Sequence, residues 1–356
     1  MTTPRLLALA TATPSYVLDQ DEAAAMAAEV FRGKVFRTPD LLSIFENTGI
    51  RTRKAVRPLA WYGEPHGWPE RNAVYLENAQ DLYVEVANKA LAAAGLQASD
   101  IGQLVTVSSS GIATPSLEAR AAGRMGFRAG VRRTPVFGLG CGGGVAGLGL
   151  AERLARTDPE LPVLLVIVEL SSLAVRPDAA TKENIISSAL FGDGAAAAVV
   201  SAAPDAAGRA IECSGEHLWP DSLDVMGWRI DPVGFGVILS PAVPAFVERE
   251  MPQAAQAFLD RAGLTAAEVS RYVCHPGGAK VVPAIEAALG LAAGSLDVER
   301  QVLAEYGNMS APTALFVLDR VLNGGSASAD GSGRLVVSAM GPGFTAQFVS
   351  LGAVGA

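Results

Sequence analysis

The sequence is poor in cysteine and histidine, which narrows the chemistry it can perform. Its 356 residues hold three cysteines, none in a CxxC pair, so neither a disulfide framework nor a zinc knuckle is expected. We therefore predict no metal site, and a free thiol is available for chemistry. Any mechanism that needs imidazole must use His66, His217 or His275.

Charge and long apolar runs are also scarce. Only 18% of the residues are charged and the formal net charge is −8, which does not favour binding to a nucleic-acid phosphate backbone. The apolar stretch 161–170 is far shorter than the roughly 20 residues that cross a bilayer. The first residues lack the charged and apolar regions of a secretory signal. We expect a cytoplasmic protein with no nucleic-acid or membrane partner.

What the sequence has is a regular alternation of apolar runs and alanine-rich stretches of helical spacing, which predicts an α/β protein. The order of elements is similar in the two halves, 1–210 and 211–356, and suggests a duplicated core. Helices are expected at 74–96, 243–262, 280–290 and 311–322, and strands at 101–111, 163–172, 271–278 and 334–343. A loop is expected at 192–194, before a strand of small residues.

Cys141 stands where a short strand gives way to a helix, in the glycine-dense turn 138–144. At a helix N-terminus the macrodipole and the unpaired N–H groups favour the thiolate, so we expect a lowered thiol pKa and a nucleophilic sulfur. The same N–H groups could hold an oxyanion. The alternative is a buried cysteine that acts as a small hydrophobe, the commoner fate of a lone cysteine.

The same turn satisfies a second motif. Gly138, Gly140 and Gly143 match GxGxxG between a strand and a helix, which is the dinucleotide-binding fingerprint. This leaves a nucleotide-dependent oxidoreductase open. The acid that would bind the ribose, Glu169, lies somewhat late and inside an apolar run.

A thioester-forming thiol needs a base and, for decarboxylation of malonyl groups, donors that stabilise an enolate. His275 ends a predicted buried strand at a Pro-Gly-Gly turn, and Asn308 precedes a helix in YGNMSAPT. Their alternatives are a satisfied core histidine and a helix N-cap or turn residue. Cys274 should point into the core, on the opposite side of the strand from His275. His66 is expected at the surface.

Five strings occur in order along the chain: GLGCGGGVAGL, ALFGDGAAAAVV, HPGG, YGNMSAPT and MGPGFT. Together they resemble the type III polyketide synthases, the chalcone synthase-like branch of the thiolase superfamily, over essentially the whole chain. The resemblance implies a five-layered αβαβα thiolase fold of two duplicated halves, and a homodimer. It implies that Cys141 carries the growing chain, that His275 keeps the sulfur as a thiolate, and that His275 and Asn308 hold the thioester oxygen. The substrates would be a starter acyl-coenzyme A and malonyl-coenzyme A, with no other cofactor.

The resemblance also assigns a substrate cavity. Phe191 corresponds to an aromatic gatekeeper, although ordinary core packing is its alternative. Ser171, Ala174 and Val237 stand where plant enzymes carry two threonines and a phenylalanine. The altered cavity suggests a fatty-acyl starter closed to an alkylpyrone or alkylresorcinol. Further cavity positions implied by the resemblance are Ser109, Thr114, Ser310 and Pro342.

The basic residues that hold the coenzyme A phosphates in plant members are not evident here. We expect Lys280, Gly278 and Arg51 to contribute to coenzyme A binding instead. Three alternatives to a polyketide synthase stay open: a ketoacyl synthase-like initiating enzyme, the oxidoreductase above, and a non-catalytic thiolase-fold partner protein whose Cys141 would resist iodoacetamide.

Overall fold

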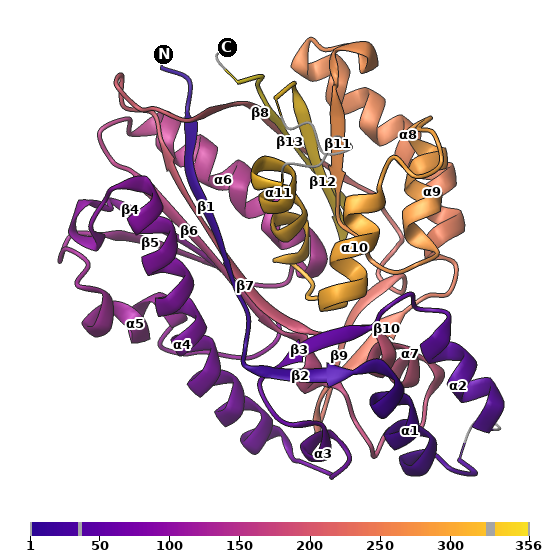
Figure 1. Cartoon of the computed structure of the whole chain (residues 1–356). Coiled ribbons are helices and arrows are strands. Elements are labelled where there is room, and N and C mark those ends of the chain that lie inside the picture. The colour runs from indigo at the N-terminus through magenta and orange to yellow at the C-terminus, as the bar shows by residue number, and fades with distance from the viewer. Residues whose placement is uncertain (1, 35–37, 325–331, 355–356) are drawn as a thin grey trace.

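The computed structural model describes residues 2–34, 38–324 and 332–354 of the chain. Its main feature is a large mixed β-sheet (Figure 1). The strands of this sheet are β1 (Arg5–Ala12), β4 (Gln103–Val107), β5 (Arg132–Val136), β6 (Val163–Leu170), β7 (Asp193–Ser201), β8 (Arg209–Leu218), β11 (Arg271–Cys274), β12 (Leu335–Gly341) and β13 (Thr345–Leu351). Their order in the described sheet is β11-β12-β13-β8-β1-β7-β6-β4-β5.

The strand order shows an internal duplication. The first half contributes β1-β7-β6-β4, with β5 added at the edge, and the second half contributes β8-β13-β12-β11. In each half the first strand lies beside the last, followed by the next to last and then the second. The halves meet where β1 pairs with β8 through Arg5 and Ala210, and Leu6 and Arg209. The similar order of elements in the sequence therefore reflects one topology used twice.

Helices form three layers around the two halves of the sheet. The helices are α1 (Gln20–Val30), α2 (Thr38–Glu46), α3 (Leu59–Tyr62), α4 (Trp68–Ala94), α5 (Leu117–Met125), α6 (Gly143–Thr157), α7 (Lys182–Leu190), α8 (Val243–Ala262), α9 (Val281–Ala288), α10 (Asp297–Tyr306) and α11 (Thr313–Asn323). Helices α6 and α11 lie between the two halves of the sheet, α4 and α5 cover the outer face of the first half, and α8 and α9 cover that of the second (Figure 1). The five-layered αβαβα architecture is confirmed.

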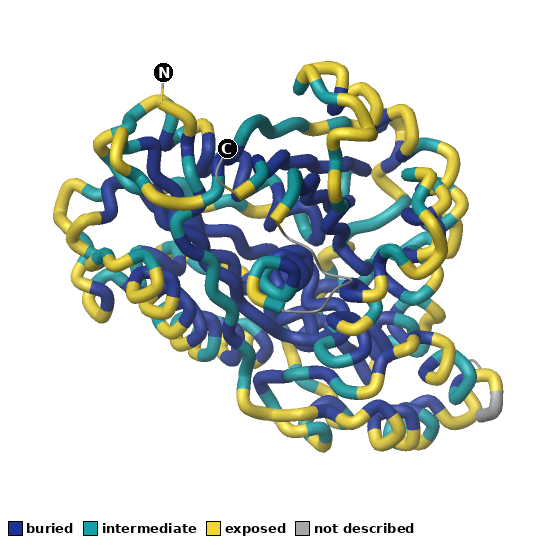
Figure 2. Tube along the Cα trace, turned by 45° about the horizontal axis from the view of Figure 1, so that its top comes forward, coloured by how far each residue is buried: buried dark blue, intermediate teal, exposed yellow. Residues whose placement is uncertain are grey.

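The apolar side chains explain the layers, because each layer boundary has its own buried cluster. One cluster joins α6 and α11 to both halves of the sheet, a second lies under α4, and a third lies under α8 and α9. In Figure 2 the inner strands and central helices are dark blue, and the outer loops and helix faces are yellow. None of the described helices combines the length and the apolar character needed to span a bilayer.

Several element boundaries follow the sequence closely and three do not. Helix α8 covers 243–262 as expected, and α4 ends against a left-handed Gly95, although it begins earlier than expected, at Trp68. Strand β11 ends at Cys274, so the predicted strand 271–278 is too long and His275 falls on a turn. The predicted loop 192–194 is also too long, since β7 begins at Asp193.

Two small two-stranded sheets lie outside the large sheet, and the second is a hairpin. Strands β2 (Tyr16–Asp19) and β3 (Thr52–Ala55) form one, and β9 (Met226–Asp231) and β10 (Gly234–Leu239) form the other. The β9–β10 hairpin packs against α7 and the short 3₁₀ turn η3 (Ser171–Ala174). This places it beside the candidate site.

Candidate active site

Cys141 lies in the 3₁₀ turn η2 (Gly140–Gly142), directly before α6. The glycines of this turn permit close contact with the second half of the chain. Gly140 has a φ of +44°, and a Cβ there would lie 2.6 Å from Cδ of Pro342, while a Cβ at Gly144 would lie 2.2 Å from the carbonyl oxygen of Ala311. The protein itself thus fills the space beside the turn, which argues against a pyrophosphate cradle.

Glu169, the expected ribose-binding acid of the nucleotide alternative, is engaged elsewhere. Both of its carboxylate oxygens lie 3.0 Å from the backbone N–H of Ser109, which donates to them. The side chain is buried, and burial raises the pKa of its carboxyl group to about 7. Neither the glycine turn nor Glu169 is therefore available to bind a dinucleotide, which argues against the nucleotide-binding hypothesis.

Asn308 lies beside the sulfur. Its Oδ1 is 3.9 Å from Sγ of Cys141 and accepts a 2.8 Å hydrogen bond from the backbone N–H of Ser310. Ser310 makes this bond from a left-handed φ of 61°, which is uncommon for serine and is found mostly where function requires it. The Asn308 Nδ2 donates to the Gly277 carbonyl oxygen at 3.1 Å. The amide is thus fixed on both sides.

His275 approaches the same place from the end of β11. Its backbone N–H donates to the Ser338 carbonyl oxygen at 2.9 Å. Both ring nitrogens are buried, and neither has a hydrogen-bond partner among the described residues. A Cβ on Gly277 would lie 3.7 Å from Nε2, so the absence of a side chain there leaves one side of the ring open. Buried polar groups are normally satisfied, and an orphaned imidazole in a pocket is therefore a candidate to bind substrate.

The charge state expected for the sulfur is wrong for the unliganded site. Burial raises the pKa of the Cys141 thiol to about 11, and its hydrogen bonds with Ser310 and Asn308 oppose this only in part. Burial also lowers the pKa of His275 to about 4. Burial therefore favours the neutral form of both groups.

The lowered His275 pKa predicts an acid-dependent loss of stability. Between pH 6.5 and 4 the unfolded chain binds a proton that the folded chain does not, so stability present above that window is lost as pH falls through it. Replacing His275 with glutamine removes this loss. The fall in the free energy of unfolding between pH 8 and pH 5, measured with urea, should be about 2 kcal/mol smaller for His275→Gln than for the parent. His217→Gln is the matched control, and equal pH dependence of His275→Gln and the parent would contradict the neutral histidine.

Two connected cavities lead from the surface to Cys141. The inner one has about 560 Å³ of empty space and the outer one about 1230 Å³. They share four lining residues, Leu190, Met226, Leu239 and Gly277. Cys141 and Asn308 line the inner cavity, and His275 lines the outer one. Cys141 and His275 therefore line neighbouring cavities that share part of their walls.

Most of the cavity positions expected from the sequence lie where they were placed. The inner lining includes Phe191, Ser171, Val237, Ser310 and Pro342. Lys280 and Gly278 line the outer cavity.

Other expected positions differ. Within the described chain, Ala174, Ser109 and Thr114 lie outside the lining of both cavities. Ser109 instead uses its backbone N–H to bind Glu169 and its hydroxyl to accept a bond from Gly138. Arg51 also lies outside, with its side chain 69% exposed and 3.8 Å from Glu305, so its assignment to coenzyme A is not supported.

The prediction that His66 is a surface residue is wrong. Its side chain is 9% exposed, its ring stacks on Trp61 at 3.9 Å, and Nδ1 lies 2.8 Å from Glu70. Cys274 is buried in the core as expected. The described residues contain no group of three His, Cys, Asp or Glu side chains that could hold a metal ion.

Sequence reasoning missed most of the cavity wall. The β9–β10 hairpin supplies Met226, Gly227, Trp228, Ile238 and Leu239 to the inner lining. A signal was present, because MGWRIDPVGFGVIL holds two short β-prone runs around an Asp-Pro-Val-Gly turn. Lys182, at the start of α7, was missed as a second lysine of the outer cavity.

Comparison with known proteins agrees with this geometry. Residues 2–204 match the family model described as "Chalcone and stilbene synthases, N-terminal domain", and 210–355 match its C-terminal counterpart. A "Putative chalcone synthase" of Bacillus subtilis is 34% identical over 97% of both chains. A "1,3,6,8-tetrahydroxynaphthalene synthase" of Streptomyces peucetius is 40% identical over 87% of this chain and 83% of the relative.

A third relative, an "Alpha-pyrone synthesis polyketide synthase-like" protein of Mycobacterium tuberculosis, is 30% identical over 95% of this chain and 88% of its own length. Among solved structures, the bacterial type III polyketide synthase that makes tetrahydroxynaphthalene in Streptomyces coelicolor superposes with a TM-score of 0.91 at 30% identity, covering 98% of this chain and 99% of that one. A brown-algal enzyme, PKS-I of Ectocarpus siliculosus, gives a TM-score of 0.90 at 28% identity, with 99% of each chain covered.

Proposed function

Because the chain belongs to the chalcone and stilbene synthase family of type III polyketide synthases, and is thus an acyltransferase, we propose that it builds a polyketide on Cys141 by condensing an acyl starter with malonyl units. The observation that carries this proposal is the placement of the thiol. Cys141 ends a two-part channel, 3.9 Å from the Asn308 amide, while the unpartnered His275 imidazole lines the outer cavity.

The first step is loading. The Cys141 sulfur attacks the carbonyl carbon of the acyl-coenzyme A, and its proton passes to His275, whose unprotonated ring nitrogen has no other partner and can accept it. The C–S bond to coenzyme A breaks, and the departing thiolate takes the proton from His275. The starter is then a thioester of Cys141. Because burial opposes a resting thiolate, the proton leaves only as the new bond forms.

The second step is extension. Malonyl-coenzyme A loses carbon dioxide, and the electron pair of the broken C–C bond forms an enolate whose oxygen accepts hydrogen bonds from His275 and from the Asn308 amide. The enolate carbon attacks the Cys141 thioester, and the sulfur leaves. The product is longer by two carbons and remains attached to coenzyme A. Transfer back to Cys141 allows another cycle, and ring closure ends the series.

The starter we propose is a fatty acyl group, with closure to an alkylpyrone or alkylresorcinol. The channel is mostly apolar, and Ser171 and Val237 are small residues in its inner wall. A second candidate is an aromatic product made from short starters, which the tetrahydroxynaphthalene synthases at up to 40% identity favour. Acyl-coenzyme A starters of increasing length, each assayed with malonyl-coenzyme A, separate the two. Turnover restricted to malonyl or short aromatic starters would exclude the fatty-acyl proposal.

We also propose a homodimer. Strand β5 is an edge of the large sheet, and next to it Phe137 is 55% exposed and Ile112 is 43% exposed around a hollow of about 690 Å³. Exposed apolar side chains gathered at a sheet edge are typical of a surface covered by a partner. Sedimentation velocity that finds only monomer at micromolar concentration would contradict this.

We propose that two lysines bind the phosphates of coenzyme A. Lys182 and Lys280 are exposed and line the outer cavity. Exposed charge pairs contribute about 0.5–1 kcal/mol each, so Lys182→Ala and Lys280→Ala should each raise KM for malonyl-coenzyme A about threefold, and the double variant about tenfold, with kcat little changed.

The control for this prediction removes the phosphates from the substrate. A malonyl-pantetheine thioester lacks the nucleotide, so its KM should be the same for the parent and the double variant. Lys89→Ala, which changes a lysine paired with Glu85 on α4, should leave both values unaltered. An equal rise in KM for both thioesters would show that the lysines shape the cavity and do not bind phosphate.

A further inference from the structure

One wall of the inner cavity is a small structure held by side-chain contacts, which include packing of Phe235 on Trp68 and of Trp228 on Phe191. Six residues of the cavity lining lie on the β9–β10 hairpin, which forms its own two-stranded sheet and pairs with no strand of the large one among the described residues. Isolated two-stranded hairpins are marginally stable in water. The position of this wall must therefore come from its contacts with the rest of the chain.

Two polar contacts of described side chains attach the hairpin to the first half of the chain. Near the cavity, Trp228 donates from Nε1 to the Ser109 carbonyl oxygen at 2.8 Å. At the tip, Oδ2 of Asp231 accepts a 2.6 Å hydrogen bond from NH1 of Arg176. The Trp228 ring also stacks on Phe235, with centroids 5.6 Å apart.

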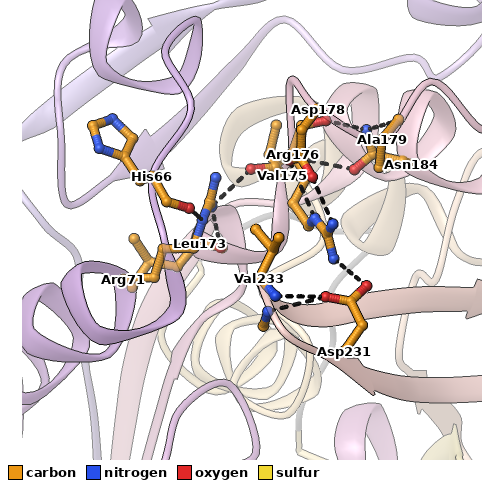
Figure 3. Close-up of polar contacts among 11 residues, drawn as sticks. His66, Arg71, Leu173, Val175, Arg176, Asp178, Ala179, Asn184, Asp231 and Val233 are labelled. Carbon is orange, nitrogen blue, oxygen red and sulfur yellow. Dashed lines mark hydrogen bonds and ion pairs between the residues drawn. The ribbon is translucent and has the colours of Figure 1, made fainter.

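Asp231 joins the turn of the hairpin to this second contact. While Oδ2 binds Arg176, Oδ1 accepts the backbone N–H groups of Val233 at 2.8 Å and Gly234 at 3.2 Å (Figure 3). One carboxylate therefore closes the turn and anchors it. A displacement of Asp231 would move the turn and both strands together.

Arg176 is itself held firmly. Its side chain is only 8% exposed, and NH2 bonds Asp178 at 2.6 Å. Its backbone is fixed by Asn184, which accepts from the Arg176 N–H at 3.1 Å and donates to its carbonyl at 2.6 Å.

The segment before Arg176 is anchored from α4. NH1 of Arg71 donates to the carbonyl oxygens of Leu173 at 2.6 Å and Val175 at 2.8 Å, as Figure 3 shows. This segment begins at Ser171 in the inner cavity. Arg176 thus links the segment that begins at Ser171 to the hairpin wall of the cavity.

We propose that the Arg176–Asp231 ion pair is a positioning clamp, which fixes the hairpin wall against the growing chain and so limits how many malonyl units are added. The inference rests on the proposed function, because it concerns the chain extended on Cys141. A chain that lengthens inside the inner cavity meets Met226, Trp228 and Leu239 of the hairpin. When the clamp holds, the wall stops extension; when it is absent, the wall yields and longer products form.

The test measures product length. Asp231→Asn keeps an oxygen for the turn N–H groups and removes the charge that binds Arg176, while Arg176→Gln removes the other partner. Each variant should raise the ratio of longer to shorter products about threefold or more, measured by liquid chromatography and mass spectrometry. Acyl loading of Cys141 and KM for malonyl-coenzyme A should stay within twofold of the parent, because neither Arg176 nor Asp231 lines either cavity.

The matched control is within the same cluster. Asp178→Asn removes the other ion pair of Arg176 but leaves Asp231 and the hairpin intact, so it should keep the parent ratio. The double variant Arg176→Gln/Asp231→Asn should give the same product ratio as each single variant, because both substitutions remove the same interaction. The clamp is overturned if Asp231→Asn keeps the parent ratio, or if Asp178→Asn shifts it equally. Absence of any malonyl-dependent product from the parent would instead refute the proposed function.

Discussion

Product formation should fall by more than about four orders of magnitude when Cys141 is replaced by alanine. The sulfur is the atom that carries the chain between cycles, and removal of a covalent nucleophile leaves only the background reaction. The substitution removes one buried atom next to Asn308 and should disturb the fold little. The assay is steady-state turnover of an accepted acyl-coenzyme A with malonyl-coenzyme A, followed by chromatography of the products.

The other cysteines provide the control for this experiment. Cys213→Ala changes a partly buried thiol on β8, far in sequence from the glycine turn and outside both cavity linings. It should retain the parent rate. If Cys141→Ala turned over within tenfold of the parent, or if Cys213→Ala were the inactive variant, Cys141 would not be the nucleophile.

The second large effect should come from His275. His275→Gln keeps a side chain able to donate a hydrogen bond but removes the group that receives the thiol proton. Positioned acid–base groups typically contribute 10²–10⁴ in rate, so we expect a loss of about 10³ in acyl loading measured in a single turnover. Decarboxylation of malonyl-coenzyme A should fall less, because the Asn308 amide remains and glutamine can still donate to the enolate oxygen.

This difference between the two steps distinguishes a proton acceptor from a structural residue. His217→Gln, on β8, should leave both steps at the parent rate. Equal losses of loading and decarboxylation in His275→Gln, together with a lower unfolding temperature, would indicate a damaged site. Unchanged loading would remove His275 from the mechanism.

Local patterns in the sequence predicted the scaffold well. Helix α8 follows from a 20-residue amphipathic run, and β6 from an apolar run bounded by Pro162 and Ser171. The turn at His275 was expected from Pro276 and the two glycines, but the predicted strand was carried on to 278, whereas β11 ends at Cys274. The large sheet joins strands from both halves of the chain. No local sequence pattern encodes which of these strands pair with each other.

The charge of the sulfur shows why the site was harder to predict than the scaffold. From the sequence, the helix after Cys141 favours a thiolate. In the fold, contacts from distant segments, including Asn308 and Pro342, remove the sulfur from water, and desolvation dominates. Desolvation depends on how the whole chain packs, which local sequence does not reveal.

Local sequence likewise does not reveal which residues line the outer cavity or which contacts hold the β9–β10 hairpin. Arg51 lies next to strand β3 in a cationic RTRK string, yet the fold turns its side chain toward Glu305. Lys182 and Lys280 are about a hundred residues apart and meet at one cavity only after α7 and α9 are packed. The Arg176–Asp231 pair likewise spans 55 positions of sequence.

The central claim, that the Cys141 sulfur receives the acyl chain, is tested most directly by mass spectrometry of the intact protein after incubation with acyl-coenzyme A alone. We predict one added acyl mass per chain, located by peptide mapping on the segment that contains Cys141 and released by hydroxylamine. An unmodified protein that nevertheless makes product, or an acyl group on any other residue, would contradict the account.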